Sequence, residues 1–121
     1  MQTGNLLFVS GHISTDLRGK HGRDVTKEQG YEAARQVAID LLGTIHDVLG
    51  NLDRVSRLVK LHGMVNSTED FTDQPFVING ASDLLVEVFG KQGQHARAAL
   101  GMAQLPFNAA LEIELILEVV E

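Results

Sequence analysis

The chain has 121 residues, of which 44% are hydrophobic, and a formal net charge of −6. This size favours one compact domain spanning residues 1–121, and the acidic charge argues against non-specific nucleic-acid binding, since phosphate contacts need a basic surface. The absence of cysteine excludes disulfides, thiolate metal sites and thiol catalysis. No stretch reaches the ~20 apolar residues of a membrane span, and no signal-peptide pattern opens the sequence, so we expect a cytoplasmic protein without membrane attachment.

The N-terminal part of the sequence predicts one strand followed by a polar loop. The apolar run at residues 6–10 indicates a buried strand, and Gly11 marks a bend after it. Residues 13–25 are polar and contain two glycines that permit tight turns, so we expect a loop or hairpin there. We interpret the most basic cluster of the chain, which lies in this loop, as solvent-exposed. The cluster consists of Arg18, Lys20, His21 and Arg23.

A long amphipathic helix is predicted next. Residues 26–29 (Thr-Lys-Glu-Gln) match a capping box, in which the Thr26 hydroxyl and the Gln29 amide satisfy backbone groups of the first turn. Gly50 and Asn51 are typical of a helix end. Between these signals, apolar residues recur at helical spacing and predict one buried stripe. The stripe consists of Ala34, Ala38, Leu41, Leu42, Ile45 and Leu49.

Residues 54–66 predict a long strand that is apolar on one face and mixed on the other. Leu58 and Met64 are assigned to the mixed face, beside polar neighbours. The apolar face is assigned Val55, Val59, Leu61 and Val65. A turn is expected at residues 67–70.

A second helix follows the turn. Pro75 suits its first turn, where the missing N–H is no loss, and Gly90 ends it. Gly80 lies inside the helix at a cost of roughly 1 kcal/mol relative to alanine, so we expect a close approach of its backbone to the sheet. The predicted buried stripe consists of Val77, Ala81, Leu84, Leu85 and Val88.

The last quarter of the chain predicts two strands, at residues 97–104 and 111–120. Pro106 cannot donate to a strand ladder, so the turn between them lies there, and a hairpin is the simplest hypothesis. The second strand alternates with a period of two, and one of its faces is entirely apolar. Its other face carries Glu112 and Glu114 but also Ile116 and Val120, which indicates a surface partly covered by another subunit.

The predicted order is strand, loop, helix, strand, helix, strand, strand. Two amphipathic helices on one face of a mixed β-sheet form a two-layer α+β fold, and this is the fold class that we expect. The mixed second faces of the strands at residues 54–66 and 111–120 require a cover that two helices on the opposite side do not supply. The sequence therefore predicts self-association.

Three ordered blocks carry a resemblance to a known family. The first is residues 5–11, and the second combines residues 70–75 with residues 79–83. The third is Arg97 followed by small residues, then Leu105 and Pro106, then the Leu-Glu-Ile-Glu of residues 111–114. Together they resemble the reactive intermediate deaminase family, also called YjgF-like, whose members carry the older label of putative endoribonuclease. This resemblance implies a chorismate-mutase-like fold and closed homotrimers with sites between subunits.

The resemblance also implies roles for individual residues. Arg97 would bind the substrate carboxylate, for which the planar fork of a guanidinium is better suited than an ammonium group. Glu112 would position or activate water, whereas Ser10 and Gly11 would contact the ligand. Glu114 is expected to pair with a basic group. No cofactor is implied, and the five histidines form no metal-binding motif, so we expect no metal site.

The leading functional hypothesis is hydrolytic deamination of reactive imine or enamine intermediates, which gives 2-oxo acids and ammonia at trimer interfaces. The alternatives are an endoribonuclease of the same family and a non-catalytic trimer that binds small carboxylates or partner proteins. Family members place an aromatic pocket wall on a strand before the Gly-Asn block, and the only tyrosine here, Tyr31, lies in the first predicted helix. The sequence therefore does not identify the natural small-molecule carboxylate substrate.

Overall fold

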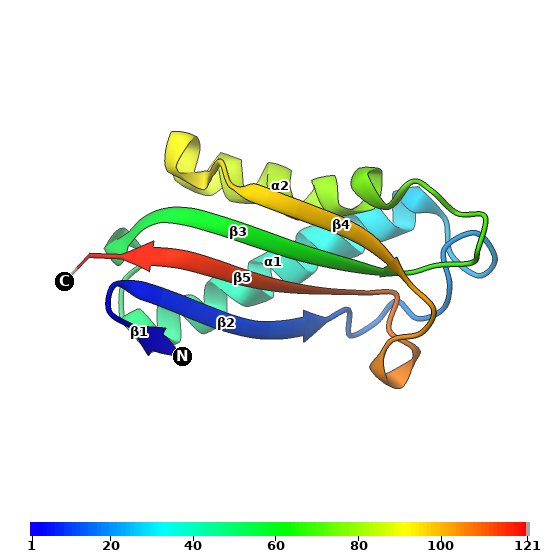
Figure 1. Ribbon diagram of the computed structural model, residues 1–121, viewed down its shortest axis with the longest axis horizontal. Coiled ribbons are helices and arrows are strands. Elements are labelled where there is room, and N and C mark those ends of the chain that lie inside the picture. The colour runs from blue at the N-terminus through cyan, green and yellow to red at the C-terminus, as the bar shows by residue number, and fades with distance from the viewer. Residues whose placement is uncertain (121) are drawn as a thin grey trace.

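The computed structural model describes residues 1–120, in which five strands form one mixed sheet and two α-helices pack against one of its faces (Figure 1). The predicted order of elements and the α+β class are confirmed, and a short N-terminal strand is added. The strands are β1 (Gln2–Thr3), β2 (Leu6–Ile13), β3 (Val55–Asn66), β4 (Ala96–Met102) and β5 (Leu111–Val119). The α-helices are α1 (Lys27–Leu49) and α2 (Gln74–Phe89), and 3₁₀ turns lie at Leu52–Arg54, Gly90–Gly93 and Pro106–Asn108.

The strand order across the sheet is β1-β2-β5-β3-β4. β4 runs parallel to β3, and the other neighbouring strands are antiparallel. Because β3 lies between β4 and β5, the predicted hairpin of residues 97–104 with residues 111–120 is wrong. The crossover through α2 returns the chain to the sheet as β4, parallel to β3. The segment after β4 then passes the end of β3, so that β5 pairs with β3 on the side opposite to β4. Alternation along a strand identifies its faces but not its neighbours.

Helix α1 begins and ends where the sequence predicts. The Thr26 side chain accepts a hydrogen bond from the Gln29 N–H, and the Gln29 side chain accepts one from the Thr26 N–H. Gly50 closes the helix in the left-handed conformation at φ 81°. All six residues of the predicted stripe are buried in the core. No helix among residues 1–120 is long and apolar enough to cross a membrane.

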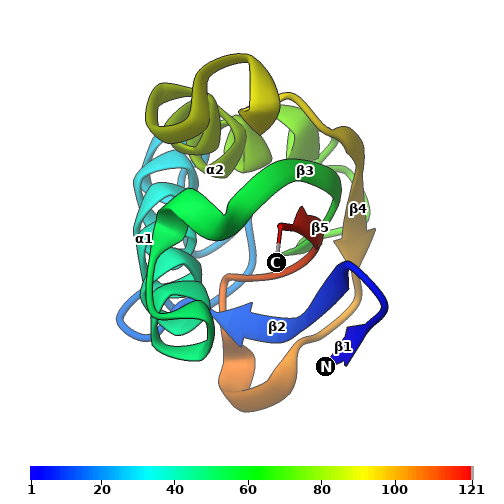
Figure 2. The same cartoon turned by 90° about the vertical axis from the view of Figure 1, so that its left-hand side faces the viewer.

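Helix α2 packs beside α1 on the same face of the sheet, as Figure 2 shows. Pro75 lies in its first turn, and four of the five stripe residues are buried together with Ile78. Val88 is 46% exposed, so its assignment to the stripe is wrong. Val88 lies in the last turn and lines an open hollow beside residues 52–56, which leaves its side chain accessible to solvent.

Gly80 is required by a close approach to α1, so the predicted approach to the sheet is wrong. A Cβ at this position would lie 2.0 Å from the carbonyl oxygen of Tyr31 and 3.2 Å from the backbone nitrogen of Arg35. Both atoms belong to the α1 backbone. The two helices therefore approach so closely that only glycine fits between them.

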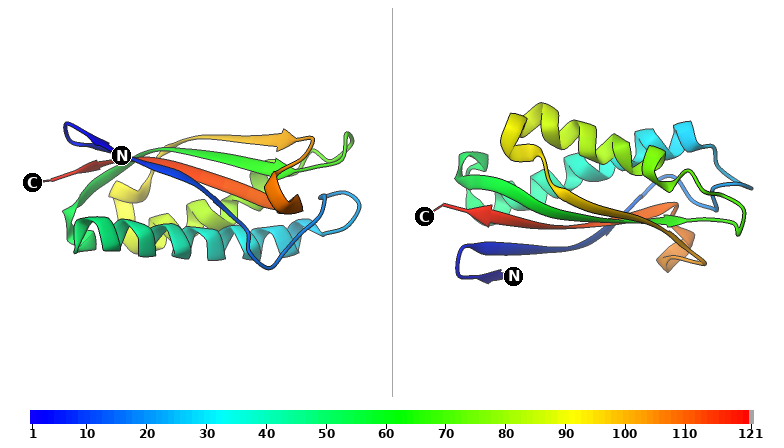
Figure 3. Two further views of the ribbon diagram at one scale, coloured as in Figure 1. Left: turned by 90° about the horizontal axis from the view of Figure 1, so that it is seen from below. Right: turned by 45° about the horizontal axis from the view of Figure 1, so that its top comes forward.

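The sheet buries one face against the helices and leaves the other uncovered by them, as the left view of Figure 3 shows. Leu111, Ile113, Leu115, Leu117 and Val119 of β5 are all buried, as predicted. We call the opposite surface the open face. Its residues are Phe8, Ser10, Lys60, His62, Met64, Ala98, Leu100, Glu112, Glu114 and Ile116.

The assignment of faces on β3 is wrong at one end. Leu58 is buried at 1% exposure, whereas Val59 is 38% exposed. The β3–β5 ladder shifts register between Leu58 and Lys60, and such an irregularity reverses which side chains face the core. Met64 lies beyond the shift and remains half-buried on the open face, as predicted.

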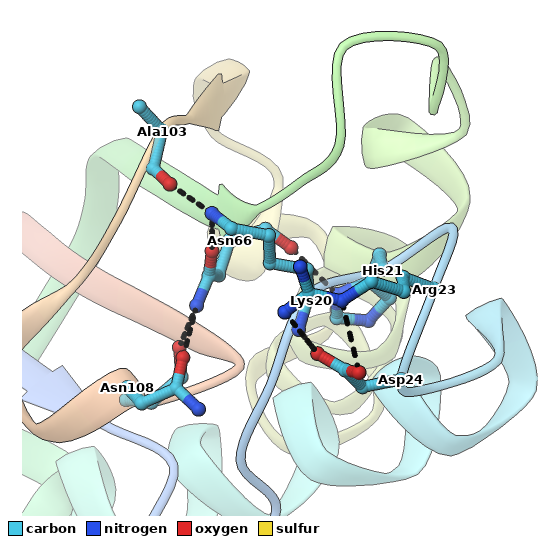
Figure 4. A network of polar contacts seen from close by, with 8 residues as sticks. Lys20, His21, Arg23, Asp24, Asn66, Ala103 and Asn108 are labelled. Carbon is cyan, nitrogen blue, oxygen red and sulfur yellow. Dashed lines mark hydrogen bonds and ion pairs between the residues drawn. The ribbon is translucent and has the colours of Figure 1, made fainter.

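The basic loop before α1 is held against the sheet, so its interpretation as a solvent-exposed cluster is wrong for Lys20 and His21. Figure 4 shows Lys20 reaching Asn66, the last residue of β3. The Lys20 ammonium donates to Asn66 Oδ1 at 2.9 Å and to the Ala103 carbonyl. The buried Asn66 amide in turn donates to the Ala109 carbonyl at 3.0 Å. Asn66 thereby joins the loop, β3 and the segment between β4 and β5.

His21 is fully buried beneath this network. Its Nδ1–H donates to the Asn66 carbonyl at 3.1 Å, because a carbonyl can only accept, and its ring lies 5.3 Å from that of Phe71. Nε2 has no hydrogen-bond partner among residues 1–120. A Cβ at Gly30 would lie 2.1 Å from that nitrogen, so Gly30 makes room for the ring. Burial lowers the pKa of His21 from its ordinary value of 6.5.

We predict that Gly80→Ala destabilises the protein. Alanine improves helix propensity by up to ~1 kcal/mol, but overpacking against a backbone carbonyl typically costs more, so we expect a net loss of about 1–3 kcal/mol in the free energy of unfolding. Urea unfolding measures this loss. Gly43→Ala is the matched control, since among residues 1–120 no atom outside the local backbone of its own helix and its chain neighbours lies within 4 Å of the added Cβ, and it should be stabilising. Equal stability of the Gly80→Ala and wild-type proteins would contradict the close approach of the helices.

We predict that stability falls in mild acid because of His21. The folded state lowers the pKa of this imidazole, so the unfolded chain takes up its proton first as pH drops. The contribution is fully present above pH 6.5 and is lost as pH falls below that value toward the folded-state pKa. Urea unfolding between pH 7.5 and 5 should show a shallower decline for His21→Asn, which keeps a donor near the Nδ1 position but cannot titrate. Identical slopes would rule His21 out as a source of the acid sensitivity.

Candidate functional site

Arg97 projects from the edge strand β4 toward α2. In the β3–β4 ladder Arg97 lies opposite the buried Leu61, so it belongs to the helix-facing side of the sheet. Its Nη1 donates to Asn79 Oδ1 at 2.8 Å and to Ser82 Oγ at 3.3 Å. The side chain is exposed, and within residues 1–120 it forms no ion pair. The guanidinium is thus oriented by neutral groups and keeps its charge available.

Three residues that were not predicted from the sequence accompany this guanidinium: Asn79 and Ser82 accept its hydrogen bonds, and His95 contacts Ser82. Ser82 Oγ lies 2.9 Å from His95 Nε2, and His95 Nδ1 lies 2.6 Å from the Gly93 carbonyl oxygen. A three-residue spacing places Asn79 and Ser82 on the same face of α2, which is a signal that the sequence offered. His95 carried no such signal, because only the packing of β4 beside α2 brings it to Ser82.

Ser10 and Gly11 form a β-bulge on β2. The register passes from Val9 opposite Leu115 to His12 opposite Ile113, so Ser10 and Gly11 together oppose the single residue Glu114. His12 fastens the bulge to α1, since its Nδ1 donates to the Ser10 carbonyl at 3.0 Å and its Nε2 lies 2.9 Å from the Thr44 hydroxyl. The bend that was predicted at Gly11 is this bulge.

Glu112 lies directly over the bulge. A Cβ on Gly11 would be 2.1 Å from Glu112 Oε2, so the absence of a side chain at Gly11 makes room for the carboxylate. The fold thereby brings together three of the four predicted site residues: Ser10, Gly11 and Glu112. Glu112 is half-buried, and no ion pair of Glu112 is found among residues 1–120.

Next to the bulge, the open face contains a cavity of about 620 Å³. His62 Nδ1 donates to Glu114 Oε1 at 3.0 Å, which confirms the expected pairing of Glu114 with a basic group. Lys60 also lines the cavity. The β3–β5 register places His62 opposite Glu114 and Lys60 opposite Ile116, and neither basic residue was predicted because the sequence does not reveal this register. The lining residues are Met1, Phe8, Val9, Ser10, Lys60, His62, Ala98, Leu100, Glu114, Leu115 and Ile116.

A second hollow, of about 550 Å³, lies between residues 14–17 and α1. Its lining includes four carboxylate residues together with apolar residues such as Val37. None of the predicted site residues lines it. Among residues 1–120, no group of three or more His, Asp or Glu side chains is arranged to hold a metal ion.

Arg97 and Glu112 do not meet within one chain. Arg97 lies opposite Leu61 and Glu112 opposite Met64, so they are separated by three residues, or ~10 Å, along β3. They are also two strand spacings, another ~10 Å, apart across the sheet and point to opposite faces. A single chain therefore carries two separate halves of the predicted site.

Comparisons with known proteins give consistent relationships. Residues 1–119 match the family described as YjgF/chorismate mutase-like, putative endoribonuclease. The chain is 44% identical to protein TCP17 of Trypanosoma cruzi over 122 aligned positions, which cover 96% of this chain and 76% of that protein. It is 43% identical to Atu1372 of Agrobacterium tumefaciens, a protein of unknown function, with a TM-score of 0.97 over 99% of this chain and 79% of the other.

Two further solved structures share the fold. A putative endoribonuclease from Shewanella oneidensis is 28% identical, with a TM-score of 0.95 over 98% of this chain and 82% of that protein. RidA from the Antarctic bacterium Psychrobacter sp. PAMC 21119 is 25% identical, with a TM-score of 0.63 over 98% of this chain and 85% of RidA. The family match extends over nearly the whole chain and agrees with the mixed sheet and its two helices. This chain therefore belongs to the YjgF/chorismate mutase-like family and has its fold.

Proposed function

We propose that the protein is a hydrolytic deaminase of imine and enamine intermediates derived from 2-amino acids. The observation that carries this proposal is the exposed guanidinium of Arg97, which is held by Asn79 and Ser82 and has no acidic partner within residues 1–120. Such a group is suited to bind a small carboxylate through two charge-assisted hydrogen bonds. The similarity to a protein named RidA supports the same proposal of a deaminase.

The proposed reaction needs only water and proton transfer. An enamine tautomerises to the 2-imino acid, water adds to the C=N carbon, and the resulting amino alcohol expels ammonia to give the 2-oxo acid. Arg97 holds the carboxylate, so the imine carbon is fixed in place. Glu112 accepts a hydrogen bond from the attacking water, takes its proton and delivers a proton to the leaving nitrogen. Ser10 and the backbone at Gly11 contact the ligand beside Glu112.

We propose that these groups meet between subunits of a homotrimer. Arg97 and Glu112 lie on opposite faces of one sheet, so a site that uses both requires Arg97 of one subunit and the bulge of its neighbour. The open face supports such assembly, because it exposes Phe8 at 39% and Leu100 at 48%, beside the half-buried Met64 and Ile116. Covering this apolar surface yields roughly 25 cal/mol for each Å² removed from water.

Two alternatives make different predictions for the same purified protein. An endoribonuclease is supported by the family description, whereas the net charge of −6 disfavours binding to a phosphate backbone. A non-catalytic trimer that binds carboxylates uses the same Arg97 anchor without turnover. Ammonia release would indicate the deaminase and RNA cleavage the endoribonuclease. Carboxylate binding without either reaction would indicate the non-catalytic trimer.

We predict that the protein releases ammonia from a freshly generated 2-imino acid and that Arg97→Lys lowers kcat/KM by about 10- to 100-fold. Lysine keeps the charge but loses the bidentate hydrogen bonds, which are worth ~1.5–3 kcal/mol when a charged group is involved. Glu112→Gln should mainly lower kcat, by about 10²-fold or more, because it removes the proton acceptor. A coupled ammonia assay measures both variants.

Arg23→Lys is the control for this experiment, since that arginine is exposed and pairs with the adjacent Asp24. It should retain wild-type activity. Full activity of Arg97→Lys would exclude the carboxylate fork. Cleavage of RNA by highly purified protein, without ammonia release, would favour the endoribonuclease.

We predict that a charge on the open face disrupts assembly and activity together. Met64→Asp and Ile116→Asp place a carboxylate at half-buried positions that the neighbouring subunit would cover, and desolvating it is costly. Sedimentation velocity at micromolar concentration should give a trimer for the wild type and smaller species for the variants. Val48→Asp is the matched control, because Val48 is 61% exposed on α1. A fully active wild-type monomer would refute the shared site.

A further inference from the structure

We infer that Ser82 and His95 are positioning residues that determine which edge of the Arg97 guanidinium receives the ligand carboxylate. The inference rests on the proposed role of Arg97 as the anchor. It adds that the ligand binds side-on, to the edge formed by Nε–H and Nη2–H. The chain of hydrogen bonds from Gly93 through His95 and Ser82 to Arg97 carries the argument.

The first step concerns the protons of His95. Its Nδ1 lies 2.6 Å from the Gly93 carbonyl oxygen, which can only accept, so Nδ1 carries a hydrogen. In the neutral ring Nε2 is then an acceptor. Nε2 lies 2.9 Å from Ser82 Oγ, and the Ser82 hydroxyl therefore donates to it. The half-buried setting of both side chains keeps this orientation in place.

The second step concerns the lone pairs of Ser82. A hydroxyl has one hydrogen, and His95 accepts it, so Ser82 presents only lone pairs to Arg97. Nη1 of Arg97 lies 3.3 Å away and donates one hydrogen to this oxygen. Nη1 donates its other hydrogen to Asn79 Oδ1 at 2.8 Å. Both hydrogens of Nη1 are thus occupied by the protein.

The third step concerns what remains for a ligand. A guanidinium has five N–H donors, and no bond from Nε or Nη2 of Arg97 is found within residues 1–120. Nε–H and one Nη2–H lie parallel and match the spacing of the two oxygens of a carboxylate. An end-on approach through Nη1 would place the carboxylate against the acceptor oxygens of Ser82 and Asn79. Side-on binding avoids this repulsion, so a planar carboxylate, as in a 2-imino or 2-oxo acid, fits the free edge.

The first test measures binding of an unreactive 2-oxo acid, 2-oxobutyrate, by calorimetry to the full chain. Ser82→Ala frees one Nη1 hydrogen and releases the guanidinium, so it should weaken binding roughly 3- to 10-fold, the usual effect of one lost hydrogen bond. Ser82→Thr retains the hydroxyl and should restore most of the affinity. His95→Gln, whose amide oxygen can accept from Ser82, should bind more tightly than His95→Phe, which cannot.

Ser56→Ala is the matched control. Ser56 is also half-buried and also donates to a side chain, Glu118 Oε1 at 3.0 Å, but it lies on β3 away from Arg97. It should bind 2-oxobutyrate as the wild type does. Circular dichroism confirms that each variant is folded before its affinity is compared.

The second test is nitrogen-15 NMR, which a general loss of stability would not imitate. The wild-type His95 signals should report an Nδ1–H tautomer, and 2-oxobutyrate should shift the Arg97 Nε–H proton downfield. In Ser82→Ala, the ligand-induced shift should decrease because the guanidinium is no longer held to one edge. An Arg97 Nε–H signal that does not respond to bound ligand would overturn side-on binding.

The outcomes separate this inference from the proposed function. If Arg97→Lys abolishes 2-oxobutyrate binding while Ser82→Ala and His95→Phe bind like the wild type, the anchor stands and the positioning role is wrong. If the wild type does not bind 2-oxobutyrate at all, the anchor and the positioning role are both wrong. Weakened binding in Ser82→Ala with recovery in Ser82→Thr supports both.

Discussion

The pairing of β3 along both of its edges is the constraint on which the rest of the structure depends. β3 has the antiparallel β5 on one side and the parallel β4 on the other. A parallel neighbour requires a crossover, and α2 supplies it while packing beside α1 on one face of the sheet. Gly63 of β3 permits this packing, since a Cβ there would lie 2.7 Å from Ile78 carbons. The position of β3 between β5 and β4 thus determines both the two layers and the separation of Arg97 from Glu112.

Two polar side chains occupy space that a glycine leaves free. The Glu112 carboxylate lies over Gly11, and the imidazole of His21 lies over Gly30. The two cases differ in consequence, because Glu112 is half-buried on the open face whereas His21 is sealed in the interior with Nε2 unpartnered within residues 1–120. The first arrangement leaves a polar group available to a ligand. The second arrangement makes the His21 imidazole part of the core, so its protonation changes the free energy of unfolding.

In both halves of the candidate site, the charged side chain is positioned without an ion pair within residues 1–120. Arg97 is oriented by a neutral amide and a neutral hydroxyl, so its charge is directed without being neutralised. Glu112 is likewise placed by shape, through Gly11, and not by an ion pair within residues 1–120. Resemblance of sequence blocks was sufficient to select these residues and the Ser10–Gly11 pair. It did not reveal that one chain holds them on opposite faces of its sheet, and this separation makes a neighbouring subunit central to the proposed chemistry.

Features that depend on residues a few positions apart were determined by the sequence itself. The capping box at Thr26, the left-handed end at Gly50 and the two faces of β5 need only short-range hydrogen bonds, backbone sterics and a period of two. The tertiary structure alone decided which strand lies beside β5, that Gly80 meets α1, and that His95 reaches Ser82. These contacts join segments far apart in the chain, and a local pattern cannot encode them, because it describes the face that an element buries and not the partner that covers it.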